Sequence, residues 1–316
     1  MAKSGENVPN SDGGLRVLTL DGGGSKGFYT LGVLHELEAM VGCRLCDRFD
    51  LIYGTSTGSI IGTLLALGQS VDQIHTLYKQ HVPAIMGAWT RDKKSAALAA
   101  LADEVFGKYT FADMKTRVGI VATKWMTELP MIFKGDPAQA FGRKGSFRPG
   151  FGVSLAKAVQ ASCSAYPFFN RTTVVTDQGE EIELFDGGFC ANNPTLYAIA
   201  DAAHAIGSDR RNLRVVNVGV GEFPAKRAKP HVWAIGLVIP TIELTPKILE
   251  VNTKSMEQLR SLLFSDVQTV RISDMFDEPA LATDFLESDL AKLDLIRQRG
   301  RDSFASRETV LSQMLS

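Results

Sequence analysis

Two turns and one aspartate carry the chemistry that this sequence can support. Residues 54–58 read Gly-Thr-Ser-Thr-Gly, the G-x-S-x-G pattern of a sharp strand-to-helix turn that exposes a nucleophilic serine. Asp186-Gly187-Gly188 follows an apolar run, and an aspartate at the end of a strand can accept the proton of a serine hydroxyl. We therefore predict that Ser56 is a nucleophile and that Asp186 is its base.

A run of three glycines supplies groups that can stabilise negative charge during such a reaction. Gly22, Gly23 and Gly24 belong to the sequence Asp-Gly-Gly-Gly-Ser-Lys-Gly at 21–27, and glycine leaves backbone N–H groups open to an anion. We expect these amides to form an oxyanion hole for a tetrahedral intermediate. The residues expected to support the turns around the site are Lys26, Gly27, Gly54, Gly58, Gly187 and Gly188.

The glycine loop also allows two other interpretations. Residues 23–27 are themselves a G-x-S-x-G, so Ser25 is an alternative nucleophile, although a glycine run suits free amides better than a rigidly aimed side chain. The loop also fits the dinucleotide-binding pattern G-x-G-x-x-G, which requires an acidic residue near the end of the next strand. The next expected strand ends at Tyr53 and has Asp50 at its beginning, which disfavours a nucleotide cofactor.

Histidine is the rival general base. The chain has five histidines, and the order Ser56, Asp186, His231 is that of an α/β-hydrolase triad. That fold has more chain between its oxyanion loop and its serine turn than the single crossover expected here, which favours a two-residue dyad. An aspartate base further predicts activity in mildly acidic solution. Its reference pKa is about 3.9, and even when burial raises this value we expect an acidic limb below that of histidine, whose reference pKa is about 6.5.

Strands and helices must alternate to position these turns. The apolar runs 15–20 and 49–53 each end in a glycine-rich turn, which is followed by helical spacing at 28–38 and 59–67. A right-handed crossover between two parallel strands places both turns at the carboxyl edge of one sheet. The pattern predicts an α/β fold with a mainly parallel sheet. Further strands are predicted at 118–123, 129–133, 181–185 and 213–220, and further helices at 154–162, 193–206, 254–264 and 287–314.

Composition limits the classes of protein that this chain can be. It is 45% hydrophobic and 22% charged, which indicates a globular protein, and we expect a disordered segment at 1–14 and one domain at 15–316. The formal net charge of −1 gives no general attraction to a nucleic acid polymer. The polar N-terminus and the absence of long apolar runs predict a cytoplasmic protein. Cys43 and Cys46 lack the partners of a zinc site, so we expect neither metal nor cofactor.

Four motifs together resemble the patatin-like phospholipases. They are DGGGSKG at 21–27, GTSTG at 54–58, ASCSAYPFF at 161–169 and DGGFCANNPT at 186–195. The resemblance extends over residues 15–220 and includes the order and the spacing of the motifs. It implies a three-layer fold with helices on both faces of the sheet, a Ser-Asp dyad without histidine, an oxyanion hole in the glycine loop, and cleavage of fatty-acyl esters of membrane phospholipids.

One departure and one finer resemblance add to this expectation. Lys26 stands where the family usually has arginine, which keeps the charge but loses the planar donor fork. The compact chain, with a helical C-terminal part at 221–316, is similar to bacterial antiviral effectors of this family. That similarity implies a cyclic oligonucleotide activator, peripheral contact with the inner membrane and a homo-oligomer. Candidate phosphate contacts are Lys226, Arg227 and Lys229, or Arg143, Lys144 and Arg148.

Two stretches could contact a lipid surface. Residues 83–89 are an apolar stretch that ends in Trp89 and precedes Arg91, Lys93 and Lys94, and residues 232–242 form a second apolar run. Each stretch could instead be ordinary core or a contact between subunits. A binding or storage protein on the same fold, with an inert site, is the alternative from a different class of function.

Overall fold

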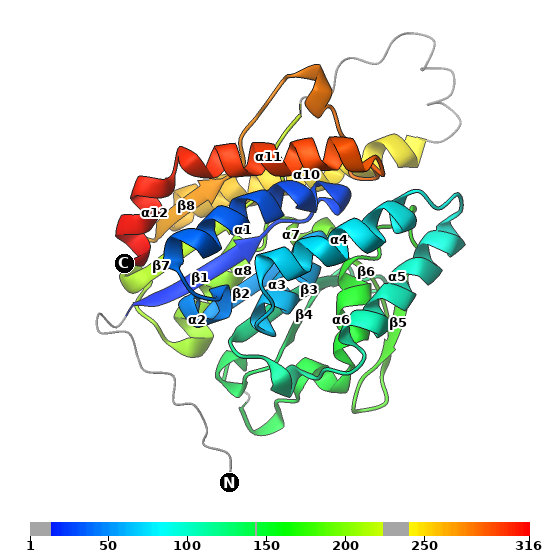
Figure 1. Cartoon of the computed structure of the whole chain (residues 1–316). Helices are drawn as coiled ribbons and strands as arrows, with labels where there is room; N and C mark the ends of the chain where they lie inside the picture. The colour runs from blue at the N-terminus through cyan, green and yellow to red at the C-terminus, as the bar shows by residue number, and fades with distance from the viewer. Residues whose placement is uncertain (1–13, 143, 224–239) are drawn as a thin grey trace.

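A central sheet of eight strands has helices on both of its faces (Figure 1). The computed structural model describes residues 14–142, 144–223 and 240–316. The strands are β1 (Leu15–Leu20), β2 (Leu51–Thr55), β3 (Arg117–Lys124), β4 (Pro130–Lys134), β5 (Thr172–Val175), β6 (Glu181–Asp186), β7 (Leu213–Val218) and β8 (Gln268–Ile272). Their order is β5-β6-β3-β2-β1-β7-β8, and β4 pairs with β3. The predicted α/β class is confirmed.

The middle of the sheet is parallel, as the crossover argument requires. Strands β3, β2, β1, β7 and β8 run in the same direction, whereas β4 and β6 are antiparallel to β3 and β5 is antiparallel to β6. Leu20 pairs with Gly54 across β1 and β2. The glycine loop and the serine turn therefore leave neighbouring strands at the same level of the sheet.

The helices form a layer on each face of the sheet. Side chains alternate along the strands, so that Leu18 and Ile52 belong to the larger core, whereas Val17 and Tyr53 belong to the smaller one. Helices α1, α3, α4, α5, α6 and α11 pack on the first face, and α7, α8 and α10 lie on the second. The α-helices are α1 (Gly27–Val41), α2 (Leu45–Arg48), α3 (Thr57–Ala66), α4 (Val71–Met86), α5 (Arg91–Phe106), α6 (Leu155–Ser162), α7 (Gly188–Ala191), α8 (Thr195–Ala200), α10 (Pro240–Leu263), α11 (Leu290–Ala305) and α12 (Glu308–Leu315).

Helix α11, near the C-terminus, packs directly against α1, the helix that follows the glycine loop. A methyl group added at Gly32 would lie 2.0 Å from the carbonyl oxygen of Arg297, and one added at Gly300 would lie 2.1 Å from that of Tyr29. Only glycine permits such a close approach of two helix backbones. Helices α11 and α12 are thereby part of the same core as the helix that follows the glycine loop.

Several predicted boundaries differ from the observed ones. The second strand is β2, Leu51–Thr55, rather than 49–53, because Phe49 ends α2 and the carboxylate of Asp50 accepts a hydrogen bond from the amide of Arg16. Helix α10 starts at Pro240 instead of near 254, and the predicted helix 287–314 is divided into α11 and α12. The predicted helix 193–206 starts as α8 and ends in a π-helical turn, Asp201–Ile206.

Strands β5 and β8 and helix α5 were not predicted from the sequence. Each of the two strands is short. In β5 buried and exposed residues alternate over only four positions, which is too short a pattern to distinguish a strand from a loop. Helix α5 lacks a clear apolar stripe in the sequence because its alanines occur on its exposed as well as on its buried side. Within the described ranges, no helix has both the length and the apolar character needed to cross a bilayer.

Candidate active site

Ser56 occupies the turn between β2 and α3 in a strained backbone conformation. Its φ and ψ are 53° and −124°, a region that non-glycine residues rarely adopt and that is typical of a nucleophile turn. A methyl group at Gly54 would lie 2.2 Å from the carbonyl oxygen of Gly58, so both ends of the turn require glycine. The amide of Ser56 donates to the hydroxyl of Ser162 at 3.0 Å, and that hydroxyl donates to the Val121 carbonyl at 2.6 Å.

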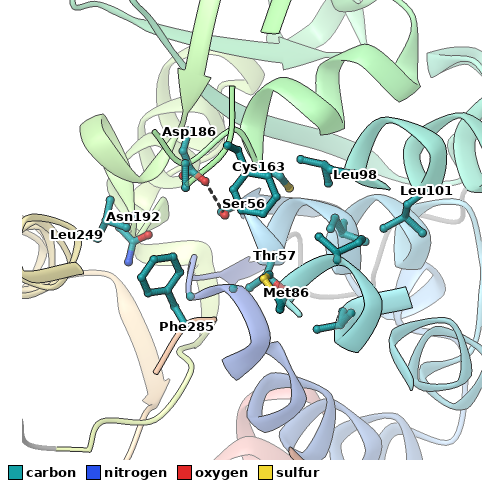
Figure 2. A pocket seen from close by; sticks show the side chains of 17 residues that line it. Ser56, Thr57, Met86, Leu98, Leu101, Cys163, Asp186, Asn192, Leu249 and Phe285 are labelled. Carbon is teal, nitrogen blue, oxygen red and sulfur yellow. Dashed lines mark hydrogen bonds between the residues drawn. The ribbon is translucent and has the colours of Figure 1, made fainter. Parts of the chain in front are cut away.

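Ser56 and Asp186 are hydrogen-bonded to each other (Figure 2). The Ser56 hydroxyl donates to Oδ2 of Asp186 at 2.7 Å. The other carboxyl oxygen, Oδ1, accepts the amide of Gly188 at 2.7 Å. Asp186 is only 1% exposed. This arrangement gives the serine a proton acceptor at contact distance and fixes the orientation of that acceptor.

Burial controls the ionisation of Asp186. It raises the pKa of the carboxyl to about 7, although the hydrogen bonds from Ser56 and Gly188 favour the charged form. A base with this pKa accepts a proton readily near neutral pH. The raised pKa implies that Asp186 loses its charge in mildly acidic solution, which argues against the expectation that an aspartate base keeps the enzyme active there. The reference pKa of aspartate does not apply to a carboxyl removed from water.

The glycine loop lies beside the serine, and its amides differ in availability. The amide of Gly22 donates to the main-chain carbonyl of Asn192 at 2.9 Å, so it is not free for an oxyanion in this conformation. The amides of Gly23 and Gly24 have no acceptor among the described residues, and both glycines line the same pocket as Ser56. Gly24 has φ 58°, which suits glycine. The candidate oxyanion donors are thus Gly23 and Gly24.

Ser25 has a structural role instead. Its side chain is fully buried, and both its hydroxyl and its amide donate to the main-chain carbonyl of Phe285 at 3.0 Å. The loop that contains Phe285 therefore holds the glycine loop in place. Neither group of Ser25 is directed at Asp186, which disfavours the alternative nucleophile.

The remaining predicted supporting residues lie in different places. A methyl group at Gly187 would lie 2.1 Å from the Val121 carbonyl oxygen, and one at Gly27 would lie 2.5 Å from the Thr57 hydroxyl, so both positions allow close packing around the turns. Lys26 lines a second, more polar pocket on the other side of the glycine loop rather than the pocket of Ser56. Burial lowers the pKa of its ammonium group.

No histidine of the described residues replaces Asp186 as base. His35, His75 and His81 lie near Asp72, Asp294 and Glu104 respectively, and His204 is exposed in the π-helical turn. His231, the proposed third member of a triad, lies outside the described residues. So do four of the candidate phosphate contacts, Arg143, Lys226, Arg227 and Lys229, as well as most of the apolar run 232–242.

An apolar pocket opens beside the dyad. Its empty space of about 640 Å³ includes part of the open solvent at its mouth. Figure 2 shows Ser56 and Asp186 between Asn192 and Leu249 on one side and Leu98 and Leu101 of α5 on the other. Its wall is almost entirely hydrocarbon, with Phe285 beside the glycine loop. The other apolar lining residues come mainly from α3, α4 and α10 and include Ile60, Val82, Ile85, Met86 and Leu249.

A buried ion pair lies at the base of the glycine loop. Asp21 is 1% exposed, and its Oδ2 accepts from the guanidinium of Arg271 in β8 at 2.8 Å. Its Oδ1 accepts from the side chain of Asn217 at 2.8 Å. Sequence reasoning assigned no role to Arg271, because nothing in the pattern around β8 connects it to residue 21. A buried charge of this kind must keep its partner.

Hydrogen bonds between helix α10 and Asn192 connect the glycine loop to the segment that follows Asp186. The side chain of Asn192 donates to the Gly22 carbonyl at 3.2 Å and to the Thr253 hydroxyl at 2.7 Å. The amide of Asn192 donates to the side chain of Asn252 at 2.8 Å. Asn192 belongs to the motif at 186–195, which could have indicated its importance. Asn252 and Thr253 carry no comparable signal in the sequence.

Comparison with known proteins gives matches over most of the chain. The family described as patatin-like phospholipase matches residues 18–199. A cUMP-AMP-activated phospholipase of Escherichia coli is 58% identical over 306 residues, which cover 96% of this chain and 95% of the relative. A cGAMP-activated phospholipase of E. coli strain TW11681 is 27% identical over 72% of each chain. The solved structure of VipD from Legionella pneumophila has a TM-score of 0.50 at 13% identity, covers 96% of this chain and 69% of its own, and shows similarity of fold alone.

Proposed function

This chain belongs to the patatin-like phospholipase family, and on that premise we propose that it is a cyclic-nucleotide-activated phospholipase with a Ser56-Asp186 dyad. The hydrogen bond of 2.7 Å between the Ser56 hydroxyl and the Asp186 carboxylate is the observation that carries the catalytic part. The apolar pocket beside it supports a fatty-acyl group as the part of the substrate that is recognised.

The reaction follows from the positions of these groups. Asp186 Oδ2 accepts the proton of Ser56 Oγ as that oxygen bonds to the ester carbonyl carbon, and the amides of Gly23 and Gly24 stabilise the oxyanion. The protonated carboxyl then gives its proton to the leaving alkoxide, which releases the lysolipid. In the second half Asp186 deprotonates a water, which attacks the acyl-enzyme. The fatty acid leaves and Ser56 recovers its proton.

The proposed activator is a cyclic dinucleotide of the cUMP-AMP type. The support is the relative activated by cUMP-AMP, with 58% identity along almost the whole of both chains. Identity at that level over 96% of this chain includes the C-terminal part as well as the catalytic motifs. An activated enzyme of this kind contacts the membrane when it is switched on, since its substrate is a membrane lipid.

Mass spectrometry of lipids tests the proposal. Purified protein is incubated with phospholipid vesicles, with and without cUMP-AMP, and the released fatty acids and lysolipids are measured. We expect low release without the nucleotide, strong release with it, and none above background for Ser56→Ala or Asp186→Asn.

Ser25→Ala is the matched control for the nucleophile, because it removes a second serine hydroxyl from the neighbouring turn. It should keep labelling by a fluorophosphonate probe, whereas Ser56→Ala should lose it. Labelling of Ser56→Ala at the wild-type level would place the nucleophile elsewhere. Full activity in the absence of any nucleotide would contradict the activation while leaving the hydrolase intact.

A further inference from the structure

Two exposed apolar surfaces lie on elements that also line the acyl pocket. Met86 at the end of α4 lines the pocket, and Trp89, three residues later, is 95% exposed. On α10, Leu249 lines the pocket, whereas its neighbours Ile248 and Val251 are 40% and 66% exposed. The connection between α4 and α5 and the first turns of α10 lie at the same end of the molecule, at the right of Figure 1.

The surface on α10 is a shallow apolar groove. Leu244, Ile248 and Val251 follow one another at helical spacing and, together with Phe189 of α7, form most of its lining. An exposed tryptophan and a row of exposed aliphatic side chains are unfavourable in water. Their position beside the acyl pocket requires a role outside the folding of the chain itself.

We propose that Trp89 and the outer side of α10 insert into the surface of a phospholipid bilayer and hold the pocket mouth against it. The proposal rests on the proposed phospholipase function. An acyl chain that leaves a bilayer to reach Ser56 must pass the pocket-lining residues of α4 and α10, Met86 and Leu249. A protein partner seated on both surfaces would close that route, so the lipid surface is the occupant that the pocket allows.

Charge contributes little to this contact. Arg91 and Lys93 are exposed at the start of α5. Asp92 lies between these two cations in the sequence, and on α10 the ammonium group of Lys254 is paired with Glu250 and Glu222. Both elements thus carry charges of both signs. Insertion of apolar side chains, rather than adsorption to anionic lipid, is the mode of binding that this surface fits.

Vesicle sedimentation tests the surface directly. Binding is measured in a Ser56→Ala background, with cUMP-AMP present, on vesicles of phosphatidylethanolamine and phosphatidylcholine and on vesicles that also contain phosphatidylglycerol. We expect the double variant Trp89→Ala/Val251→Ser to partition at least about tenfold more weakly, since it removes the area of two apolar side chains. Binding of the parent protein should change by less than about threefold between low and high salt.

Val310→Ser is the matched control, because Val310 is also exposed, at 48%, but lies in α12 at the far end of the molecule (Figure 1). With Ser56 intact, hydrolysis of vesicle lipid by the double variant should fall with its binding. Hydrolysis of a dispersed short-chain ester should stay within about twofold, since neither altered side chain lines the pocket.

The proposal is overturned if the double variant binds vesicles like its parent, or if Val310→Ser binds equally weakly. It is also overturned if the double variant loses only self-association in analytical ultracentrifugation, because the surface is then a contact between copies of the chain. Failure of the proposed function is distinguishable. In that case the wild type hydrolyses neither substrate, whereas sedimentation still reports on the surface.

Discussion

At the scale of single residues, Asp186 meets two opposing requirements. Its carboxyl must be buried away from water to hold Ser56 in one orientation, yet it must be charged to accept a proton. Burial raises its pKa to about 7, and the two hydrogen bonds that it accepts oppose this effect. The balance leaves a base whose proton affinity suits the transfer from a serine hydroxyl near neutral pH.

We expect kcat/KM to fall about tenfold for each pH unit below about 7, because protonated Asp186 cannot accept the serine proton and its pKa in the free enzyme is raised to about 7. The profile should be measured between pH 5 and 9 with a soluble ester. His204→Ala should give the same acidic limb as the wild type. Activity that persists unchanged at pH 5 would show that burial does not raise this pKa.

The oxyanion donors can be tested by one added methyl group. In Gly23→Ala the new Cβ would lie 2.7 Å from a side-chain carbon of Val220. The loop must therefore move, and its amides no longer point at the oxyanion. We expect kcat to fall on the order of a hundredfold, as for the loss of one oxyanion donor, with little change in KM. Gly145→Ala is the control, since a methyl group there meets nothing within 4 Å. Equal turnover of the two variants would contradict the assignment.

At the scale of elements, α10 connects segments that are remote in sequence. Through Asn192 it links the start of the glycine loop to the segment that follows Asp186, and Asn252 accepts the amide of Asn192 at 2.8 Å. The side chain of Asn252 also donates to the Cys190 carbonyl at 3.1 Å. A shift of α10 along its axis would therefore move the oxyanion amides relative to the base.

Asn252→Ala should lower kcat and the rate of fluorophosphonate labelling by about tenfold, since both depend on the geometry of the dyad and the oxyanion amides. The melting temperature, measured by circular dichroism, should fall only by a few degrees, because the rest of α10 still packs. Gln258→Ala on the exposed side of the same helix is the control. If Asn252→Ala is labelled at the wild-type rate despite the lower melting temperature, α10 is only a structural support.

At the scale of the whole molecule, the catalytic carboxyl costs stability. In the unfolded chain Asp186 ionises near pH 4, but in the folded chain its pKa is raised to about 7. Between these values the folded state binds the proton more tightly, so the free energy of unfolding decreases as the pH rises. Above about pH 7 the folded protein holds a buried carboxylate at the full cost.

Asp186→Asn removes that cost without changing the shape of the side chain. We expect its melting temperature to exceed that of the wild type by at least roughly 2 °C at pH 8 and to approach it at pH 5. Thermal unfolding followed by circular dichroism at both pH values measures this difference. Ser56→Ala retains the carboxyl and loses a hydrogen bond that favours its charged form, so its stability should decrease with pH at least as strongly as that of the wild type. A difference that is the same at pH 5 and pH 8 would contradict the linkage.

The sequence by itself determined the local parts of this protein. The glycine-rich turn after β1, the serine turn after β2 and the parallel pairing of those strands follow from patterns a few residues long, because turn geometry and side-chain periodicity are local properties. The order of the four motifs was enough to identify the family. It also singled out Ser56 and Asp186 as the residues that could form the dyad.

Only the tertiary structure decided how Asp186 meets Ser56. The sequence argument expected the aspartate at the sheet edge that carries the two turns, and the structure brings it there on an antiparallel strand. The last residue of β6 pairs with Ala122 of β3, one position beyond the pairing of Thr55 with Val121. Strand β3 extends past β2 and carries β6 on that extension. Three features depend on contacts between segments tens to hundreds of residues apart, which no local pattern encodes. They are the pairing of remote strands, the burial of a carboxyl and the hydrogen bonds of Asn252.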